Sequence, residues 1–268
     1  MKRLCSWLIP LAGLLLAGAC FAQAAEVVDL PTRPGVRQRM LVVQPANPAA
    51  VLVLMTGGAG NLGIYDNGSL RNDGNFLVRS RGLFVQHGYA VVLLDAPSDH
   101  NSAPYLAANF RESDEHAADI GAAVAWARKK WDLPVWLVGT SRGTQSVAYA
   151  GTVLTGASAP DGLVLSSTIL GSSRFAPSTA RPVQEMALDK LRVPVLVAHH
   201  EQDQCPVCPP SLLPALLARL SPASSKLITY QGGRSAGNPC EAMAFHGYNG
   251  IEDKVVADIA AFVAAHPR

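Results

Sequence analysis

Residues 135–143 read Val-Trp-Leu-Val-Gly-Thr-Ser-Arg-Gly, and no other stretch of the chain is as informative. The first four residues are apolar, and three of them are β-branched or aromatic, which is typical of a buried strand. A Gly-x-Ser-x-Gly pattern follows, formed by Gly139, Ser141 and Gly143, and it leads directly into a helical sequence from Arg142 to about residue 154. The segment therefore predicts a strand, a tight turn with Ser141 at its apex, and a helix.

A turn of this kind suits a nucleophilic serine. It holds the serine in a strained backbone conformation with its hydroxyl exposed above the sheet. Gly139 and Gly143 lack the side chains that would collide where the strand and the helix pass closely. The amide of Arg142 lies at the helix N-terminus, where it can stabilise an oxyanion. We therefore predict Ser141 as a nucleophile; an ordinary tight turn with a capping serine is the alternative.

The rest of the chain alternates short apolar runs with longer amphipathic stretches. This pattern predicts a mostly parallel sheet with crossover helices. An early strand between residues 37 and 44 is expected to pair antiparallel at the sheet edge. The remaining expected strands are 51–55, 90–94, 163–166, 195–198 and 227–230, and the remaining helices are 76–86, 113–130, 212–220 and 255–264. No linker divides residues 25–268, so we expect one domain.

With these elements, the sequence resembles the α/β-hydrolase superfamily over nearly all of residues 25–268. The resemblance implies a single-domain α/β fold with helices on both faces of the sheet and a site ordered serine, acid, histidine. The segment from Gly171 to Leu191, where such proteins often carry a lid, is too short for a cap domain. We therefore expect an open site with a short lid or none.

The acid is expected after the strand at residues 195–198. There the chain resembles the superfamily's His-Gly-x-x-Asp motif, with His199 and Asp203 at its ends and His200 in place of the glycine. The resemblance implies that Asp203 is the acid of the triad. Glu201 is the alternative acid, and a solvated acidic loop is the alternative to both.

The histidine is expected on the loop after the strand at residues 227–230. His246 is the histidine found there, so the resemblance implies that it is the general base. Thr56-Gly57-Gly58 follows an earlier strand and resembles the superfamily's His-Gly-x oxyanion loop, with Thr56 at the histidine position. By this match the Gly58 amide is the second oxyanion donor beside that of Arg142. A plain glycine turn is the alternative.

The first 24 residues are interpreted as a signal peptide. Lys2 and Arg3 precede an apolar run over residues 7–19, and Ala22-Gln23-Ala24 supplies the small-x-small pattern of a cleavage site. The run is shorter than the roughly 20 residues of a bilayer span, so no transmembrane span is expected after cleavage. We expect an exported protein, periplasmic or secreted. Residues 17–20 also resemble a lipobox, with Ala17 where leucine is usual, and lipidation of Cys20 is the alternative.

Three cysteines follow the leader, and a disulfide is the expectation for an exported chain. Cys240 precedes the histidine, and it is expected to pair with Cys205 or Cys208, which follow the acid. We favour Cys205, because the prolines after Cys208 lead into the next helix. Zinc requires a fourth ligand at suitable spacing, which the sequence does not show, so no metal and no cofactor are expected. A thiol-redox protein using Cys205 and Cys208 is a separate functional alternative.

Composition narrows the functional class. Of the 268 residues, 49% are hydrophobic and 16% charged, and the net charge of +2 comes without a basic run, so no nucleic-acid partner is expected. We predict a carboxylesterase-like serine hydrolase that acts on a small-molecule ester or acyl substrate through an acyl-Ser141 intermediate. Peptidase, thioesterase or acyltransferase activity would use the same residues, and a non-catalytic hydrolase-fold binding protein is the other class.

The side chain of Arg142 is expected either to receive a substrate carboxylate or to pair with Glu112 or Asp114.

Overall fold

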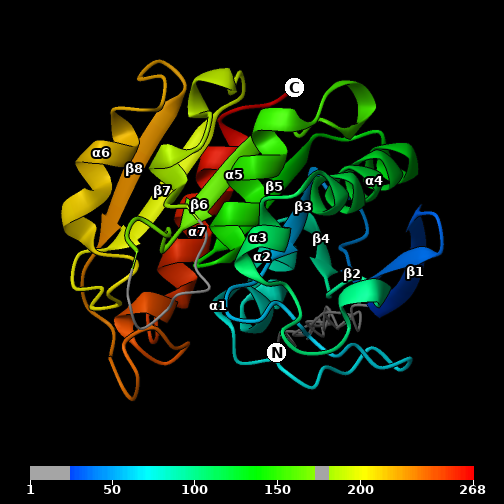
Figure 1. The fold of residues 1–268 in the computed structure, drawn as a ribbon, viewed down its shortest axis with the longest axis horizontal. Coiled ribbons are helices and arrows are strands. Elements are labelled where there is room, and N and C mark those ends of the chain that lie inside the picture. Colours follow the sequence, from blue (N-terminus) through cyan, green and yellow to red (C-terminus); the bar gives the residue numbers. More distant parts are fainter. Residues whose placement is uncertain (1–24, 173–180) are drawn as a thin grey trace, which may run out of the picture.

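The computed structural model describes residues 25–172 and 181–268. The proposed leader, with Cys20, lies outside these residues, as do residues 173–180 of the segment examined for a lid. Eight strands form one sheet in the order β1-β2-β4-β3-β5-β6-β7-β8 (Figure 1). They are β1 (Ala25–Arg33), β2 (Val36–Val43), β3 (Ala50–Met55), β4 (Tyr89–Leu94), β5 (Val135–Thr140), β6 (Gly162–Ser166), β7 (Val195–His200) and β8 (Ser225–Tyr230).

The sheet is mostly parallel, as the sequence predicts. From β4 to β8 all neighbouring strands run parallel, whereas β2 pairs antiparallel with both β1 and β4. Helices cover both faces, because successive residues of a strand point to opposite sides and both sides are apolar. On β3, Val51 and Val53 pack on one face while Leu52 and Leu54 pack on the other.

The helices divide between these two faces (Figure 1). Side chains of α4 (Asp114–Trp131), α5 (Gly143–Val153) and α6 (Leu213–Leu217) belong to one core cluster. Side chains of α1 (Phe76–Arg79), α2 (Arg81–Gln86) and α7 (Glu252–Ala264) belong to the other. Within the described residues, none of the helices combines the length and apolarity needed to cross a bilayer.

Three details differ from the sequence-based expectation. The expected edge strand is β2, but it is internal, because β1 returns across a turn at Gly35 (φ +73°) and pairs outside it. The helix expected over residues 76–86 is two short helices that meet at Ser80, where the backbone (φ −90°, ψ 1°) departs from α-helical geometry. The helix expected over residues 212–220 is shorter, ending at Leu217.

Strand register determines where the loops meet. Met55, the last residue of β3, lies opposite Gly139 near the end of β5. Because parallel strands end at the same edge, the loops after β3, β5 and β7 share that edge of the sheet. These loops carry Gly58, Ser141 and Asp203, so the topology gathers the predicted site residues.

Candidate active site

Ser141 lies at the turn between β5 and α5. Its φ of 54° is in the left-handed region, which non-glycine residues rarely adopt and which costs on the order of 1 kcal/mol or more. Its amide donates to the Ser166 carbonyl on β6 at 2.9 Å, and its carbonyl accepts from the Thr144 amide at 2.9 Å. The turn predicted from Gly-x-Ser-x-Gly is therefore present, with its strain held by neighbouring backbone.

Three glycines allow this turn to pack closely. A Cβ on Gly139 would lie 2.6 Å from the Gly143 carbonyl oxygen, and a Cβ on Gly143 would collide with the Met55 carbonyl. The sequence analysis did not single out Gly57, yet a Cβ there would lie 2.7 Å from that of Ser141. No side chain fits at these positions without moving the central strands or the serine.

Asp203 and His246 are in direct contact. The Nδ1 atom of His246 donates to Asp203 Oδ2 at 2.8 Å, and the Cys205 amide donates to Asp203 Oδ1 at 2.9 Å. His199 is buried beside the same carboxylate, 3.6 Å from Oδ2. The alternative acid, Glu201, faces elsewhere and accepts hydrogen bonds from Thr229 and Gln231. The structure therefore brings Asp203, and not Glu201, to His246.

The backbone of His246 is fixed by two buried residues that the sequence analysis did not identify. Ser167 Oγ donates to the His246 carbonyl at 2.7 Å. The Tyr248 hydroxyl accepts from the Ser167 amide and donates to the Ala198 carbonyl on β7. Neither residue belongs to a recognisable motif, so their contribution is visible only in three dimensions.

The other ring nitrogen of His246 has no hydrogen-bond partner in the described chain, and the residue lines a cavity. His246 is only 4% exposed, and its Nε2 atom has no hydrogen-bond partner among the described residues. A cavity of about 450 Å³ is lined by His246, Ser141 and the loop after β3 that contains Gly58. Serine and histidine thus face one cavity, with the carboxylate of Asp203 behind the imidazole.

The loop after β3 presents the Gly58 amide. The Gly57 carbonyl accepts from the Gly60 amide at 3.2 Å. The Gly58 N–H, at the other end of the same planar peptide, therefore points the opposite way. Gly58 has φ +59°, a conformation that glycine adopts without strain. Arg142 occupies the N-cap position of α5 beside Ser141. The two residues predicted to donate to an oxyanion thus lie where the loop after β3 meets the turn between β5 and α5.

A buried arginine contacts both the loop after β3 and helix α5. Arg111, in the short helix α3 (Ala108–Arg111), is 1% exposed. Its guanidinium donates to the Gly58 carbonyl at 3.2 Å and to the Ser146 hydroxyl on α5 at 3.1 Å. Burial lowers the pKa of Arg111 to about 9, and the charge of Arg142 contributes in the same direction. Arg111 therefore links the oxyanion loop to the helix that carries the nucleophile.

The cysteines lie next to the acid and the histidine. Cys205 is bonded to Cys240, which is the pairing favoured from the sequence, and Cys208 is a free, buried thiol. Burial raises the pKa of the Cys208 thiol well above its usual value, the charge of Asp203 adds to this, and a hydrogen bond with Ser141 opposes it. The bridge joins the loop after β7 to the loop after β8, close to both predicted functional side chains.

The chain resembles known proteins in structure but not in sequence. No protein-family model matches the sequence, and no curated protein matches it. Solved structures do match. An esterase from Pyrococcus furiosus has a TM-score of 0.64 at 10% identity, over 91% of this chain and 93% of its own. A dienelactone hydrolase from Anabaena variabilis has a TM-score of 0.61 at 14% identity, over 91% of this chain and 99% of its own.

This chain has the α/β-hydrolase fold. A third structural match is a puromycin-hydrolysing peptidase from Mycobacterium tuberculosis, with a TM-score of 0.63 at 17% identity. The match covers 91% of this chain but 39% of the peptidase. Esterases and a peptidase therefore share the architecture of this chain, and its chemistry has to be argued from its own residues.

The two acidic residues that were predicted as partners of Arg142 contact other residues. Glu112 accepts from Arg181 Nε at 2.8 Å, and Asp114 accepts from the Tyr149 hydroxyl at 2.8 Å. Arg142 is partly exposed, and burial of the rest lowers the pKa of its guanidinium. The pairing of Arg142 with Asp114 or Glu112 and its contact with a substrate carboxylate both stay predictions.

Proposed function

We propose that this chain is a serine hydrolase of carboxylic esters, with Ser141 as the nucleophile, His246 as the general base and Asp203 as its orienting acid. One observation carries the proposal. Asp203 holds Nδ1 of His246 at 2.8 Å, and this leaves the unpartnered Nε2 beside a cavity that Ser141 lines from a strained strand-to-helix turn. Nucleophile, base and orienting group in this relation are the parts that nucleophilic catalysis requires.

In the proposed reaction, His246 Nε2 accepts the hydroxyl proton of Ser141 as Oγ attacks the ester carbonyl carbon. The carbonyl oxygen becomes an oxyanion, which accepts hydrogen bonds from the Gly58 and Arg142 amides. Collapse breaks the carbon–oxygen bond to the alcohol, which leaves with the proton from His246. Water then attacks the acyl-serine in the same way, releasing the acid and restoring Ser141.

The cavity favours a small, polar ester. Its volume of about 450 Å³ falls within the range of small-molecule sites. Polar residues line the cavity besides Ser141 and His246, among them Asn61, Asn72, Asp73 and Glu241. Long alkyl chains would leave these groups without hydrogen-bond partners, which is costly. The esterases among the structural matches are consistent with a small-molecule substrate.

The decisive experiment combines labelling and turnover. The disulfide-intact protein is treated with a fluorophosphonate probe, the adduct is mapped by mass spectrometry, and short p-nitrophenyl esters are assayed in parallel. We expect stoichiometric labelling of Ser141 with loss of ester turnover. Ser141→Ala should lose both, and Asp203→Asn should lower kcat by about 10⁴-fold because the imidazole loses its correct tautomer.

The same assay separates the rival functions. Turnover of amides or transfer to an added alcohol, at rates exceeding ester hydrolysis, would favour a peptidase or an acyltransferase with the same residues. Absence of labelling in folded, disulfide-intact protein would reject the serine mechanism in favour of a non-catalytic binding protein.

We also propose that residues 1–24 direct export to the periplasm or the medium. The Cys205–Cys240 disulfide supports this, because such bonds persist mainly in oxidising compartments. Fractionation of expressing cells, with N-terminal sequencing of the product, tests the proposal. An N-terminus near Ala25 is expected, and a lipid-modified Cys20 would favour the lipoprotein alternative instead.

A further inference from the structure

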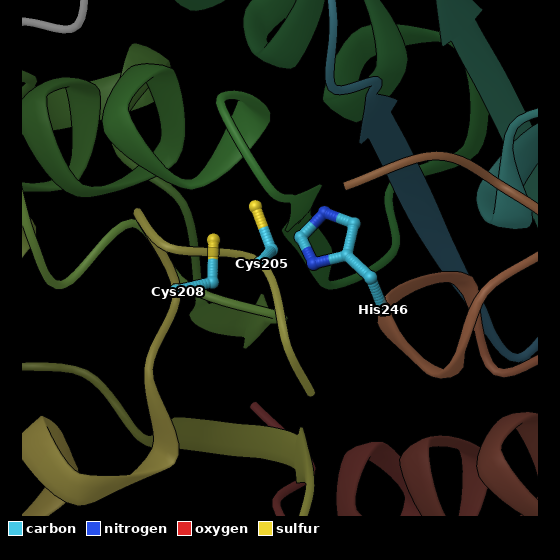
Figure 2. Close-up of side chains that lie close together, drawn as sticks. All are labelled: Cys205, Cys208 and His246. Atoms are coloured by element: carbon cyan, nitrogen blue, oxygen red, sulfur yellow. The ribbon is translucent and has the colours of Figure 1, made fainter. Parts of the chain in front are cut away.

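Three potential metal ligands lie close together, and one of them is the proposed general base, His246. Cys205 and Cys208, on the loop after β7, lie on one side of the imidazole of His246, which comes from the loop after β8 (Figure 2). The two sulfur atoms and a ring nitrogen of His246 lie within 4.8 Å of one another, and all three residues are buried. Cys240 is bonded to Cys205, so its sulfur lies 2.02 Å from one member of this group.

We propose that the reduced form of this site binds a Zn²⁺ ion through Cys205, Cys208, Cys240 and His246, and that the bound ion blocks the hydrolase. Zn²⁺ favours four sulfur or nitrogen ligands in a tetrahedron, with Zn–S near 2.3 Å and Zn–N near 2.0–2.1 Å. Those lengths place sulfur ligands about 3.8 Å apart. The ligand atoms of Cys205, Cys208 and His246 are at most 4.8 Å apart and therefore need only a small contraction around the ion. The sulfur atoms of Cys205 and Cys240, which are 2.02 Å apart in the disulfide, must separate after reduction.

The histidine is prepared for such a role. Asp203 accepts from Nδ1 at 2.8 Å, so Nε2 carries the free lone pair, and this atom is buried without a hydrogen-bond partner in the described chain. A carboxylate behind a histidine is the usual outer contact of a zinc-bound imidazole, where it fixes the tautomer and strengthens the ligand. The pair proposed for catalysis is thus also a competent ligand.

The cysteines match the donor pattern as well. Cys205 and Cys208 have the Cys-x-x-Cys spacing found in structural zinc sites. Sequence spacing alone did not reveal the other two ligands, because Cys240 and His246 lie more than 30 residues further along the chain and join the cluster only through folding. The site also explains a buried free thiol next to a disulfide, since Cys208 supplies the third sulfur.

The redox balance requires a dithiol reductant. It transfers two electrons and two protons to the Cys205–Cys240 bond, which breaks to give two thiols, while the dithiol closes to a cyclic disulfide. Zn²⁺ then binds three thiolates, releasing three protons, and accepts the lone pair of neutral His246. With Nε2 occupied, His246 has no lone pair to accept the Ser141 proton.

Metal binding is independent of the proposed hydrolase activity, and only the inhibition rests on it. The protein is reduced with excess dithiol, freed of reductant without air, and titrated with Co²⁺ as a spectroscopic substitute for zinc. We expect one equivalent to give thiolate-to-cobalt charge-transfer absorption and the visible bands of a tetrahedral ion. One equivalent of Zn²⁺ should then remove these bands.

Matched variants locate the ion. Cys208→Ser preserves the disulfide but lacks one ligand. We expect the reduced form of this variant to bind zinc more than about 100-fold more weakly than the reduced wild type, a larger loss than removal of an outer contact causes. Asp203→Asn removes only that outer contact and should cost about 10–100-fold. Ser141→Ala removes no ligand and should still bind one equivalent of zinc, and oxidised wild type should show no cobalt bands.

Several results would overturn the proposal. They are the absence of cobalt bands from reduced protein with a native circular dichroism spectrum, and equal zinc affinity in Cys208→Ser. If reduction unfolds the chain, Zn²⁺ must restore the native spectrum, because an ion bound only by the folded state stabilises it; failure to do so also rejects the site. Ester turnover unaffected by bound zinc would reject the blocking. A protein that binds zinc but never hydrolyses esters would instead refute the proposed function alone.

Discussion

Ser141 and His246 face one cavity, but the chain holds them in place by different means. Ser141 belongs to the turn between β5 and α5, where glycines let backbone pack directly on backbone. His246 lies on a long loop after β8, where a disulfide and a few side-chain hydrogen bonds fix it against the acid loop. The nucleophile side therefore depends on close packing in the sheet, and the acid–base side depends on crosslinking of loops.

The largest effect is expected where packing is tightest. Gly143→Ala places a methyl group against the Met55 carbonyl in the middle of the sheet, which cannot move without disturbing β3. We expect loss of more than about 4 kcal/mol of stability, or failure to fold. Urea unfolding and soluble yield measure the effect.

Gly82→Ala is the matched control. A Cβ on Gly82, in helix α2, has no heavy atom within 4 Å, so the substitution should be neutral or stabilise by up to about 1 kcal/mol. Similar losses in both variants would show that the turn does not depend on close backbone packing.

The acid–base side is tested by removing its crosslink. Cys205 and Cys240 are 35 residues apart in sequence. In the chain-entropy view, replacing both with serine costs about 3–4 kcal/mol for a loop of this length. We expect a lower urea midpoint and a lower kcat, because the contact between Asp203 and His246 joins the released loops. Cys208→Ser keeps the bridge and should retain most of the stability; an unchanged midpoint in the double variant would mean that packing alone holds the loops.

A third test measures how the stability of the nucleophile side depends on pH. His116 is buried and contacts the Ser146 hydroxyl of α5. Its burial lowers the pKa of the imidazole from the usual 6.5 to about 3, and the nearby charges of Arg111, His100 and Arg33 contribute in the same direction. Below pH 6.5 the unfolded chain binds a proton that the folded chain does not, so stability falls as the pH drops toward 3. Between pH 6.5 and 5 the loss is about 2 kcal/mol.

His116→Gln provides the comparison, because glutamine can still hydrogen-bond to Ser146 but does not titrate. Urea unfolding at pH 6.5 and 5 should show a fall about 2 kcal/mol smaller in the variant than in the wild type. Parallel pH dependences in the two proteins would show that other groups cause the acid sensitivity.

The same contrast explains what the sequence predicted. The strands around the nucleophile came from local apolar patterns, and the motif at residues 139–143 placed Ser141 because its glycines and its turn are a local requirement. The strand β1 was missed although Pro34-Gly35 is a turn signal, because its alternation is weak beside the leader. The general base and acid were implied by a family resemblance, and the structure brings Asp203 and His246 into contact.

The residues that support the site were beyond the sequence. Arg111, Ser167 and Tyr248 act through contacts between segments 35 to 81 residues apart, and no local pattern records such contacts. Cys208 was known as a third thiol, but its position beside Ser141 and His246 follows only from the path of two loops. Long-range side-chain contacts depend on the whole fold, whereas turns and strands depend on neighbouring residues.

The smallest expected effect is a rate of chemical labelling, and it connects the two sides. Alkylation requires a thiolate, and burial both shields Cys208 and raises its pKa. Iodoacetamide at pH 8 should therefore leave Cys208 of the folded, oxidised protein unmodified until the chain is unfolded. In the Cys205→Ser/Cys240→Ser variant, the loop loses about 3 kcal/mol of stabilisation from the disulfide and can therefore open up to about 100-fold more often. We expect the rate of Cys208 labelling to rise by up to the same factor. Equal labelling rates would mean that packing against Ile169 and Val207 protects Cys208. The bridge would then orient His246 without controlling the opening of the loop.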